Sequence, residues 1–199
     1  HREALLSAFA RSAFLAETLI QKPAFISRVV DPLSNLTDSD STITHFSTEL
    51  KIKLEALKSE DELLKILREY RNQEMARITF LDVLNKQNIE DSLAQVSALA
   101  DALINSAYHW IYQHLALRYG TPKSNNQDMH MYILGMGKLG GQELNFSSDI
   151  DLIFAYPEKG ETSGGKKALE HQQFFTKLAQ KLIQALNKVT NDGQVYRVD

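Results

Sequence analysis

Residues 135–154 read Gly135-Met-Gly-Lys-Leu-Gly-Gly-Gln-Glu-Leu-Asn-Phe-Ser-Ser-Asp-Ile-Asp-Leu-Ile-Phe154. The stretch combines a glycine-rich turn, a pair of serines and an Asp-x-Asp motif that opens an apolar, strand-like run. Glycine-rich turns present backbone amides to phosphate groups, and paired carboxylates bind divalent cations. The order of these features therefore predicts phosphoryl-type transfer on a nucleotide.

The Asp-x-Asp motif is the candidate metal site. Asp149 and Asp151 lie two positions apart, so on a strand their side chains project from one face, while Ile150 faces the core. Adjacent carboxylates repel each other unless a cation lies between them, and Mg²⁺ prefers oxygen ligands and leaves positions open for substrate phosphates. An isolated Asp-x-Asp is more often a strand start with solvent-facing side chains. The adjoining glycine turn and serine pair favour a Mg²⁺ site here.

Asp199 is the candidate third carboxylate. It ends the strand-like run 195–199, and on a neighbouring strand it would join the other two aspartates. The predicted catalytic and metal-binding set is therefore Asp149, Asp151 and Asp199. For Asp199, a surface role is equally consistent with the sequence.

The glycine turn is the candidate phosphate-binding site. Glycine allows positive φ angles and a close approach of the backbone, so the amides of the turn can contact a phosphate, with a lysine and two hydroxyls beside them. The predicted nucleotide- or phosphate-binding residues are Gly137, Lys138, Gly140, Gly141, Ser147 and Ser148. A tight turn with solvated Lys and Ser side chains is the alternative, and for Lys138 it is the more common case.

Two better-known glycine motifs do not fit this stretch. Gly135-x-Gly137-x-x-Gly140 matches a dinucleotide-binding fingerprint, but that fingerprint requires a full helix before the next parallel strand. Between Gly141 and Asp149 there is room for at most about two helical turns, whereas a parallel crossover takes on the order of a dozen residues. A P-loop is excluded because no Gly-Lys-Ser or Gly-Lys-Thr has the required spacing.

The chain before Gly120 has the apolar periodicity of helices. The pattern and its breaks predict helices over 2–21, 23–30, 43–58, 60–86 and 89–119 and a polar loop over 33–42. Ser59-x-x-Glu62 has the form of a capping box, Asn88 is a helix start signal, and Gly120 is a stop signal. We expect these helices to pack as an antiparallel bundle over 1–120.

Composition changes after the bundle. Residues 121–128 are polar and are predicted to be a linker, and 129–199 are predicted to be an α/β nucleotide-handling module. Apolar runs and turn residues in the module predict strands over 129–136, 150–156 and 195–199, a loop over 157–167 and a helix over 168–188. The predicted fold class is therefore α+β.

Composition also limits which partners and which cellular location we expect. The chain has 199 residues, with 22 Lys and Arg against 25 Asp and Glu and a formal net charge of −3, so no nucleic-acid partner is expected. Cysteine is absent, which excludes disulfides and thiolate metal sites and fits a cytoplasmic location. No apolar run is long enough to span a membrane. The chain begins with His1 and ends in a strand-like run, so we expect a piece of a longer protein.

Four charged residues follow one another along the predicted helix over 60–86. They are Arg68, Arg71, Glu74 and Arg77. Such a series usually forms a solvated face with ion pairs between neighbouring turns, and we predict that arrangement.

The motif Gly137-Lys-Leu-Gly-Gly-x-Glu-Leu-x-x-x-Ser148-Asp-x-Asp151 resembles the signature of the glutamine synthetase adenylyltransferase and adenylyl-removing enzymes, which are polymerase-β-like nucleotidyltransferases. The resemblance extends from Leu67-Arg-Glu-Tyr-Arg-Asn-Gln-Glu-Met-Ala-Arg-Ile78 to Val195-Tyr-Arg-Val-Asp199. Asn145-Phe146 is similar to the N-terminal, adenylyl-removing copy of the catalytic domain, because the transferring copy more often has Gly-Tyr or a similar pair. In the family an Arg-rich Met-Arg-Leu-Arg-Pro stretch follows the last strand, so the catalytic module is expected to be C-terminally incomplete.

The resemblance implies a polymerase-β-like module in which Asp149, Asp151 and Asp199 bind Mg²⁺. The implied reaction removes AMP from a tyrosine of glutamine synthetase by phosphorolysis and releases ADP, with the PII signal protein, an adenine nucleotide and phosphate as further partners. Some arginines of the charged series would then face the active site. Two alternatives remain: the adenylyl-transferring copy, which consumes ATP, and a non-catalytic module that docks glutamine synthetase or the PII protein.

Overall fold

The computed structural model describes residues 2–30 and 39–199, with the side chains of 39–41 excepted. Its N-terminal part consists of short helices, which are α1 (Arg2–Arg11), α2 (Ala13–Gln21), the 3₁₀ helix η1 (Pro23–Phe25) and α3 (Ile26–Val29). The single helix predicted over 2–21 is wrong, because it is interrupted at Ser12. The backbone of Ser12 is extended, and its hydroxyl caps α2 by accepting from the Leu15 amide at 3.2 Å.

Three long helices follow, namely α4 (Ser39–Leu54), α5 (Glu60–Val83) and α6 (Ile89–Tyr119). Helix α4 begins and ends about four residues earlier than predicted, and residues 31–38 of the predicted loop region lie outside the described residues. The capping box is confirmed: the Glu62 amide donates to the Ser59 hydroxyl, and the Ser59 amide donates to the Glu62 carboxylate, each at 3.3 Å.

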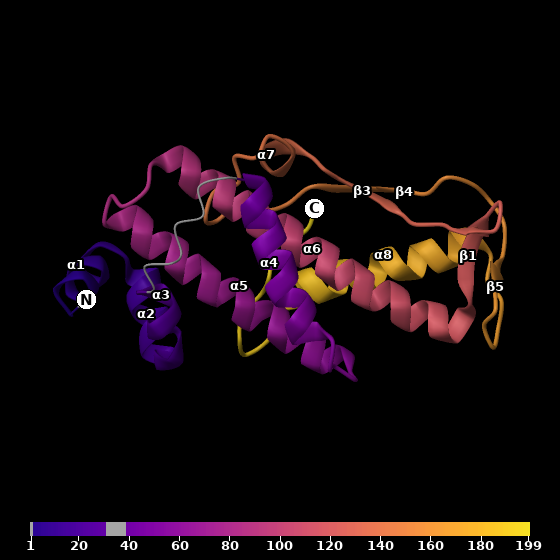
Figure 1. Ribbon diagram of the computed structural model, residues 1–199, viewed down its shortest axis with the longest axis horizontal. Helices are drawn as coiled ribbons and strands as arrows, with labels where there is room; N and C mark the ends of the chain where they lie inside the picture. Colours follow the sequence, from indigo (N-terminus) through magenta and orange to yellow (C-terminus); the bar gives the residue numbers. More distant parts are fainter. Residues whose placement is uncertain (1, 31–38) are drawn as a thin grey trace.

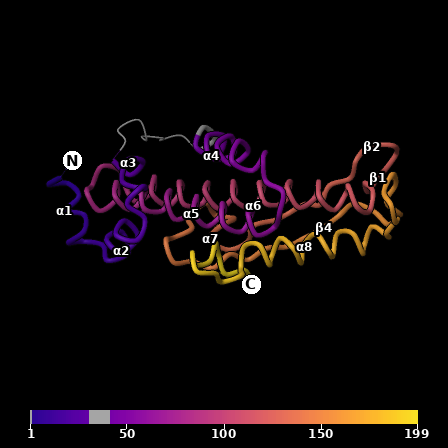
Figure 2. The backbone as a smooth tube through the Cα atoms, turned by 90° about the horizontal axis from the view of Figure 1, so that it is seen from below, coloured from indigo at the N-terminus to yellow at the C-terminus, as the bar shows by residue number. Residues whose placement is uncertain are grey.

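Both predicted ends of α6 are also confirmed. The Asn88 side chain accepts from the Asp91 amide at 2.7 Å, and Gly120, with a φ of +82°, ends the helix. The 31 residues of α6 make it about 46 Å long. It forms the axis of the molecule: Figure 2 shows α4 on one side of α5 and α6, and α8 (His171–Asn187) on the other.

A two-stranded antiparallel sheet carries the stretch with the glycine turn and the Asp-x-Asp motif. Strand β3 (Tyr132–Gly135) pairs with β4 (Leu152–Ala155), and Leu134 lies opposite Ile153. Between the strands, the glycine turn forms the short helix α7 (Gly137–Gly140). Figure 1 shows this sheet running along α6 and α8.

A second small sheet corrects the prediction of a linker. Residues 121–128 form a hairpin of β1 (Thr121–Ser124) and β2 (Gln127–Asp128), and β5 (Thr162–Ser163), from a predicted loop, pairs with β1. Asn125 and Asn126 both have positive φ angles, of +49° and +62°, as a two-residue type I′ turn requires. The prediction of a linker over 121–128 did not take this turn signal into account.

The core joins the helical part to the sheet. One hydrophobic cluster contains Leu103 of α6, Phe174 of α8 and Ile150 ahead of β4. The helices with small antiparallel sheets confirm the predicted α+β class, while the division into two domains stays a prediction. Among the described helices, none combines the length and hydropathy needed to cross a bilayer.

Candidate functional site

The three predicted carboxylates lie beside one parallel backbone pairing. Ile150 forms a bridge with Val198: its amide donates to the Arg197 carbonyl at 2.9 Å, and its carbonyl accepts from the Asp199 amide at 3.1 Å. The strand predicted over 195–199 is thus reduced to this single bridge. The Leu152 amide also donates to the Asp199 carbonyl. Ile150 is buried, so the alternating side chains beside it project to the opposite, exposed face.

Arg197 lies among these carboxylates. Its guanidinium contacts the Asp149 carboxylate at 2.5 Å and the Asp199 carboxylate at 3.3 Å. The side chains are 62% exposed for Arg197, 39% for Asp149 and 55% for Asp199. The pairing register explains the contact, because residue 197 lies opposite 149 when 198 lies opposite 150. This arginine was not among the predicted site residues, and its place two residues before Asp199 is the signal that the sequence offers for it.

The donor chemistry of this face fits a divalent cation. Carboxylate oxygens are the ligands that Mg²⁺ prefers, and the guanidinium already paired with two of them marks a place where positive charge is favourable. Among the described side chains, those of residues 2–30 and 42–199, no three of His, Cys, Asp or Glu are close enough together to form a metal-binding set.

Gly137 places the turn against the second aspartate. Its φ is +53°, and a Cβ atom there would lie 3.1 Å from Oδ2 of Asp151. The Met136 amide also donates to the Asp151 carbonyl at 2.9 Å. A glycine is favoured at 137 both by its backbone angle and by the room that the Asp151 carboxylate occupies.

The later glycines serve the packing of α7. The Gly140 amide donates to the Met136 carbonyl at 3.2 Å, and the Gly141 amide donates to the Gly137 carbonyl at 3.1 Å. A Cβ atom at Gly140 would lie 2.5 Å from the Gly135 carbonyl oxygen, so this glycine lets α7 fold back closely on the end of β3. These two amides are used inside the chain, and of the four predicted turn residues Gly137 is the one that lies against a predicted carboxylate, that of Asp151.

The serine pair is held by an asparagine. Ser148 donates its hydroxyl to the Asn145 side-chain oxygen at 2.7 Å, and the Ser147 amide donates to the same oxygen at 3.2 Å. The Lys138 ammonium donates to the Ser148 hydroxyl at 3.5 Å. The turn thus brings Lys138 and Ser148 together and leaves both side chains accessible to an anion.

Two polar residues of α6 anchor the loop between α7 and β4. The buried hydroxyl of Ser97 accepts from the Leu144 amide at 3.0 Å, and the carboxylate of Asp101 accepts from the Gln142 side-chain amide at 3.2 Å. Burial raises the pKa of Asp101, and the hydrogen bond from Gln142 opposes that shift. Both are positioning residues that sequence analysis missed. The available signal was their four-residue spacing beside the apolar stripe of the helix.

The prediction of a solvated charged face on α5 is wrong. Arg68, Glu74 and Arg77 are fully buried. Glu74 accepts from Arg77 at 2.6 Å and from Arg28 of α3 at 2.7 Å, so its carboxylate joins α3 to α5. Positions three apart drift around an α-helix, so these side chains meet different parts of the chain, and that packing excludes water: Glu74 meets Arg28 of α3, whereas Arg68 meets the backbone of residues 188 and 193.

Arg68 connects α5 to the segment that leads to Asp199. Its guanidinium donates to the carbonyl oxygens of Gly193 at 2.9 Å, of Leu64 at 2.7 Å and of Lys188. Asn72, one turn later, donates to the Asp192 carbonyl at 3.0 Å. The helical part therefore holds the turn before residues 195–199.

Arg71 lies beneath the carboxylate face rather than on it. Its guanidinium is 5.6 Å from the centre of the buried Tyr196 ring, and burial raises the pKa of Tyr196 to about 12. The Arg71 Nε and the Tyr196 hydroxyl both lack a hydrogen-bond partner among the described residues. Arg68 and Arg77 are buried and Arg71 faces an aromatic ring, and the expectation that some arginines of this series face the active site stays a prediction.

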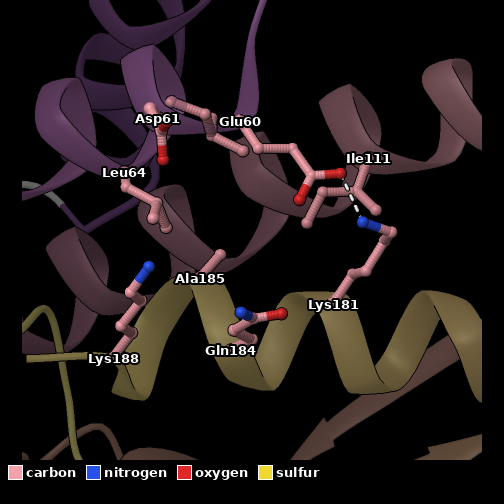
Figure 3. A pocket seen from close by; sticks show the side chains of 9 residues that line it. Glu60, Asp61, Leu64, Ile111, Lys181, Gln184, Ala185 and Lys188 are labelled. Atoms are coloured by element: carbon pink, nitrogen blue, oxygen red, sulfur yellow. Dashed lines mark hydrogen bonds and ion pairs between the residues drawn. The ribbon is translucent and has the colours of Figure 1, made fainter.

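The two described pockets lie away from the carboxylates. The smaller, of about 130 Å³, lies between α5, α6 and α8. Figure 3 shows its two lysines, Lys181 on α8 and Lys188 directly after the end of that helix, with an ion pair from Lys181 to Glu60. Asp61 also lines it, so positive and negative groups balance. A groove of about 630 Å³ lies between α4 and α6. Neither contains a predicted site residue.

These features define an α+β protein with an exposed site of paired carboxylates beside a glycine turn. Comparison with known families gives the particular group. The family model described as glutamate-ammonia ligase adenylyltransferase matches residues 2–199. The chain therefore belongs to the glutamate-ammonia ligase adenylyltransferase family.

Its relatives are named bifunctional glutamine synthetase adenylyltransferase/adenylyl-removing enzymes. One from Alteromonas mediterranea is 66% identical over 219 aligned positions, which cover 100% of this chain and 22% of the relative. One from Mannheimia succiniciproducens is 46% identical, with 98% of this chain and 20% of the relative covered. A third, from Shewanella loihica, is 46% identical with the same coverage. The chain thus spans about a fifth of the length of these relatives.

Proposed function

We propose that this chain carries the site that removes AMP from an adenylylated tyrosine of glutamine synthetase by Mg²⁺-dependent phosphorolysis. The observation that supports the proposal is that the Arg197 guanidinium contacts the carboxylates of both Asp149 and Asp199, while the Asp151 carboxylate lies against Gly137 of the glycine turn. The names of the relatives support the substrate, because they include an adenylyl-removing activity on glutamine synthetase. The PII signal protein and an adenine nucleotide are further proposed partners.

In the proposed reaction, an oxygen of inorganic phosphate attacks the phosphorus of the AMP group. The bond from that phosphorus to the tyrosine oxygen breaks, the proton of the phosphate passes to the tyrosine, and ADP is released. Asp149, Asp151 and Asp199 would hold Mg²⁺, which neutralises charge on the phosphoryl oxygens when bound. The Lys138 ammonium and the Ser148 hydroxyl, whose nitrogen and oxygen lie 3.5 Å apart, would position the incoming phosphate.

The adenylyl-transferring reaction is the second candidate. In that reaction the same groups act on ATP: the tyrosine oxygen attacks ATP, and pyrophosphate leaves. The names of the relatives support it equally, because they include both activities. The residue pair Asn145-Phe146 favours the adenylyl-removing copy of the catalytic domain.

The test is an assay of ADP release. The purified chain, extended past Asp199 by its natural residues so that the catalytic module is complete, is incubated with adenylylated glutamine synthetase, Mg²⁺ and phosphate, and ADP is measured by chromatography. We expect ADP from the wild type and from the control Asp128→Asn, whose carboxylate lies in the exposed strand β2. The variants Asp149→Asn and Asp151→Asn should lose at least about a hundredfold in rate, since each removes a charge that holds the cation.

Three other outcomes separate the alternatives. Labelling of unmodified glutamine synthetase from ATP, without ADP release, would assign the transferring reaction. ADP release that survives both aspartate substitutions would remove the metal site from the mechanism. A folded chain that is silent in both assays but binds glutamine synthetase would favour a docking role, which was the third interpretation of the sequence.

A further inference from the structure

The chain supplies its own cation to the carboxylate site. Arg197 contacts Oδ2 of Asp149 and Oδ2 of Asp199, which are two of the three proposed metal ligands. A carboxylate oxygen that is paired with a guanidinium is less available to a metal ion. Arg197 and a divalent cation therefore compete for the same face.

Arg197 is held weakly enough to leave. Its side chain is 62% exposed, and both of its carboxylate partners are more than one-third exposed. Ion pairs in such positions contribute little to stability, because water screens the charges and the long side chain loses freedom on pairing. A divalent cation gains more from two carboxylates than a single guanidinium does, so metal binding can displace the arginine.

The displaced guanidinium remains at the site. Residues 197 and 199 alternate with the buried Tyr196 and the half-buried Val198, so the Arg197 side chain stays on the exposed face that carries the aspartates. A planar guanidinium binds a phosphate group through two parallel hydrogen bonds, in a geometry that lysine cannot supply.

We propose that Arg197 alternates between two partners. Without a divalent cation it pairs with Asp149 and Asp199, and when a cation takes its place it turns to a phosphate group of the substrate. It is thus a residue that restrains metal binding and then positions the anion. The inference rests on the proposed function, because it requires the metal site and an anionic substrate.

The first experiment measures metal binding without any substrate. Mn²⁺ is titrated into the chain, and free Mn²⁺ is followed by electron paramagnetic resonance. We expect Arg197→Gln to bind Mn²⁺ about two- to fivefold more tightly than the wild type, because the competing charge is gone. Arg197→Lys keeps the charge and should stay near the wild-type value. Arg118→Gln, which removes an exposed arginine at the end of α6, is the matched control and should not change the affinity.

The second experiment measures the anion. With Mn²⁺ at saturation, ADP is titrated by calorimetry. We expect Arg197→Gln to bind ADP about tenfold more weakly than the wild type, and Arg197→Lys to recover only part of the loss, because the ammonium lacks the two-pronged geometry.

Two results would overturn the inference alone. If Arg197→Gln binds Mn²⁺ no more tightly than the wild type, Arg197 does not compete with the metal. If its ADP affinity is unchanged, the arginine does not turn to the phosphate. Absence of Mn²⁺ binding in both wild type and variant would instead overturn the proposed metal site and this inference together. Thermal melting confirms that each variant is folded.

Discussion

Asp101 shows how a single carboxylate on α6 links stability to the glycine loop. It accepts from Gln142 at 3.2 Å, and burial raises its pKa above the ordinary value of 3.8. A raised pKa in the folded state means that the folded chain takes up the proton more readily than the unfolded chain. The free energy of unfolding therefore decreases as pH rises from below 3.8 through the raised pKa.

Asp101→Asn should remove that pH dependence. The asparagine oxygen still accepts from Gln142, but no charge is buried, so we expect the variant to be more stable than the wild type at pH 7 and equal to it near pH 3. Urea unfolding across this pH range measures the difference. Glu90→Gln, at an exposed position of the same helix, is the control. A constant difference between Asp101→Asn and wild type at all pH values would contradict the prediction.

At the scale of elements, α5 and the turn 188–193 are joined through one buried guanidinium. Arg68 donates to three backbone carbonyls, two of which belong to that turn. Burial lowers its pKa, so the arrangement costs some desolvation that the hydrogen bonds offset. The segment carrying Asp199 begins directly after this turn, which makes α5 the support of the third carboxylate.

Arg68→Leu should loosen that support. Removing the guanidinium leaves buried carbonyls without donors, and we expect a loss of roughly 2–3 kcal/mol in the free energy of unfolding. Urea denaturation followed by circular dichroism measures it. Lys65→Leu, on the exposed side of the same helix, controls for the change in charge. If both variants unfold at the same urea concentration, the turn is held by other contacts.

At the scale of the whole molecule, the described residues form two separate hydrophobic clusters. The larger includes α4, α5, α6, α8 and the β3–β4 sheet, whereas the smaller joins α1–α3 to the far end of α5 through residues such as Leu15, Leu19 and Phe80. Figure 1 shows α1–α3 at one end of the molecule, around the second half of α5. The carboxylate face depends on the larger cluster.

Leu19→Ala should therefore destabilise one end of the molecule selectively. Deleting this buried side chain costs about 3 kcal/mol in the smaller cluster, so α1–α3 should exchange their amide hydrogens faster while α6 and α8 stay protected. Hydrogen–deuterium exchange with mass spectrometry measures each helix. Leu178→Ala, in the larger cluster, is the comparison and should affect α6 and α8. Uniform loss of protection in Leu19→Ala would mean that the two clusters unfold together.

The sequence by itself determined the features that depend on neighbouring residues. Ser59, Asn88 and Gly120 set the ends of helices through contacts that reach at most four positions along the chain. The strand-like runs around the glycine turn gave β3 and β4, because their antiparallel pairing needs only the short connection between them. The α+β class followed from these local signals.

Tertiary structure alone decided which distant residues meet. Arg197 pairs with Asp149, 48 positions earlier, and Arg68 binds a carbonyl 125 positions away. The same charged pattern on α5 would be solvated on an isolated helix, and only the packing of other elements against it makes it buried. Caps and periodicity act over a few residues, whereas burial and long-range pairing depend on how every helix packs around α6.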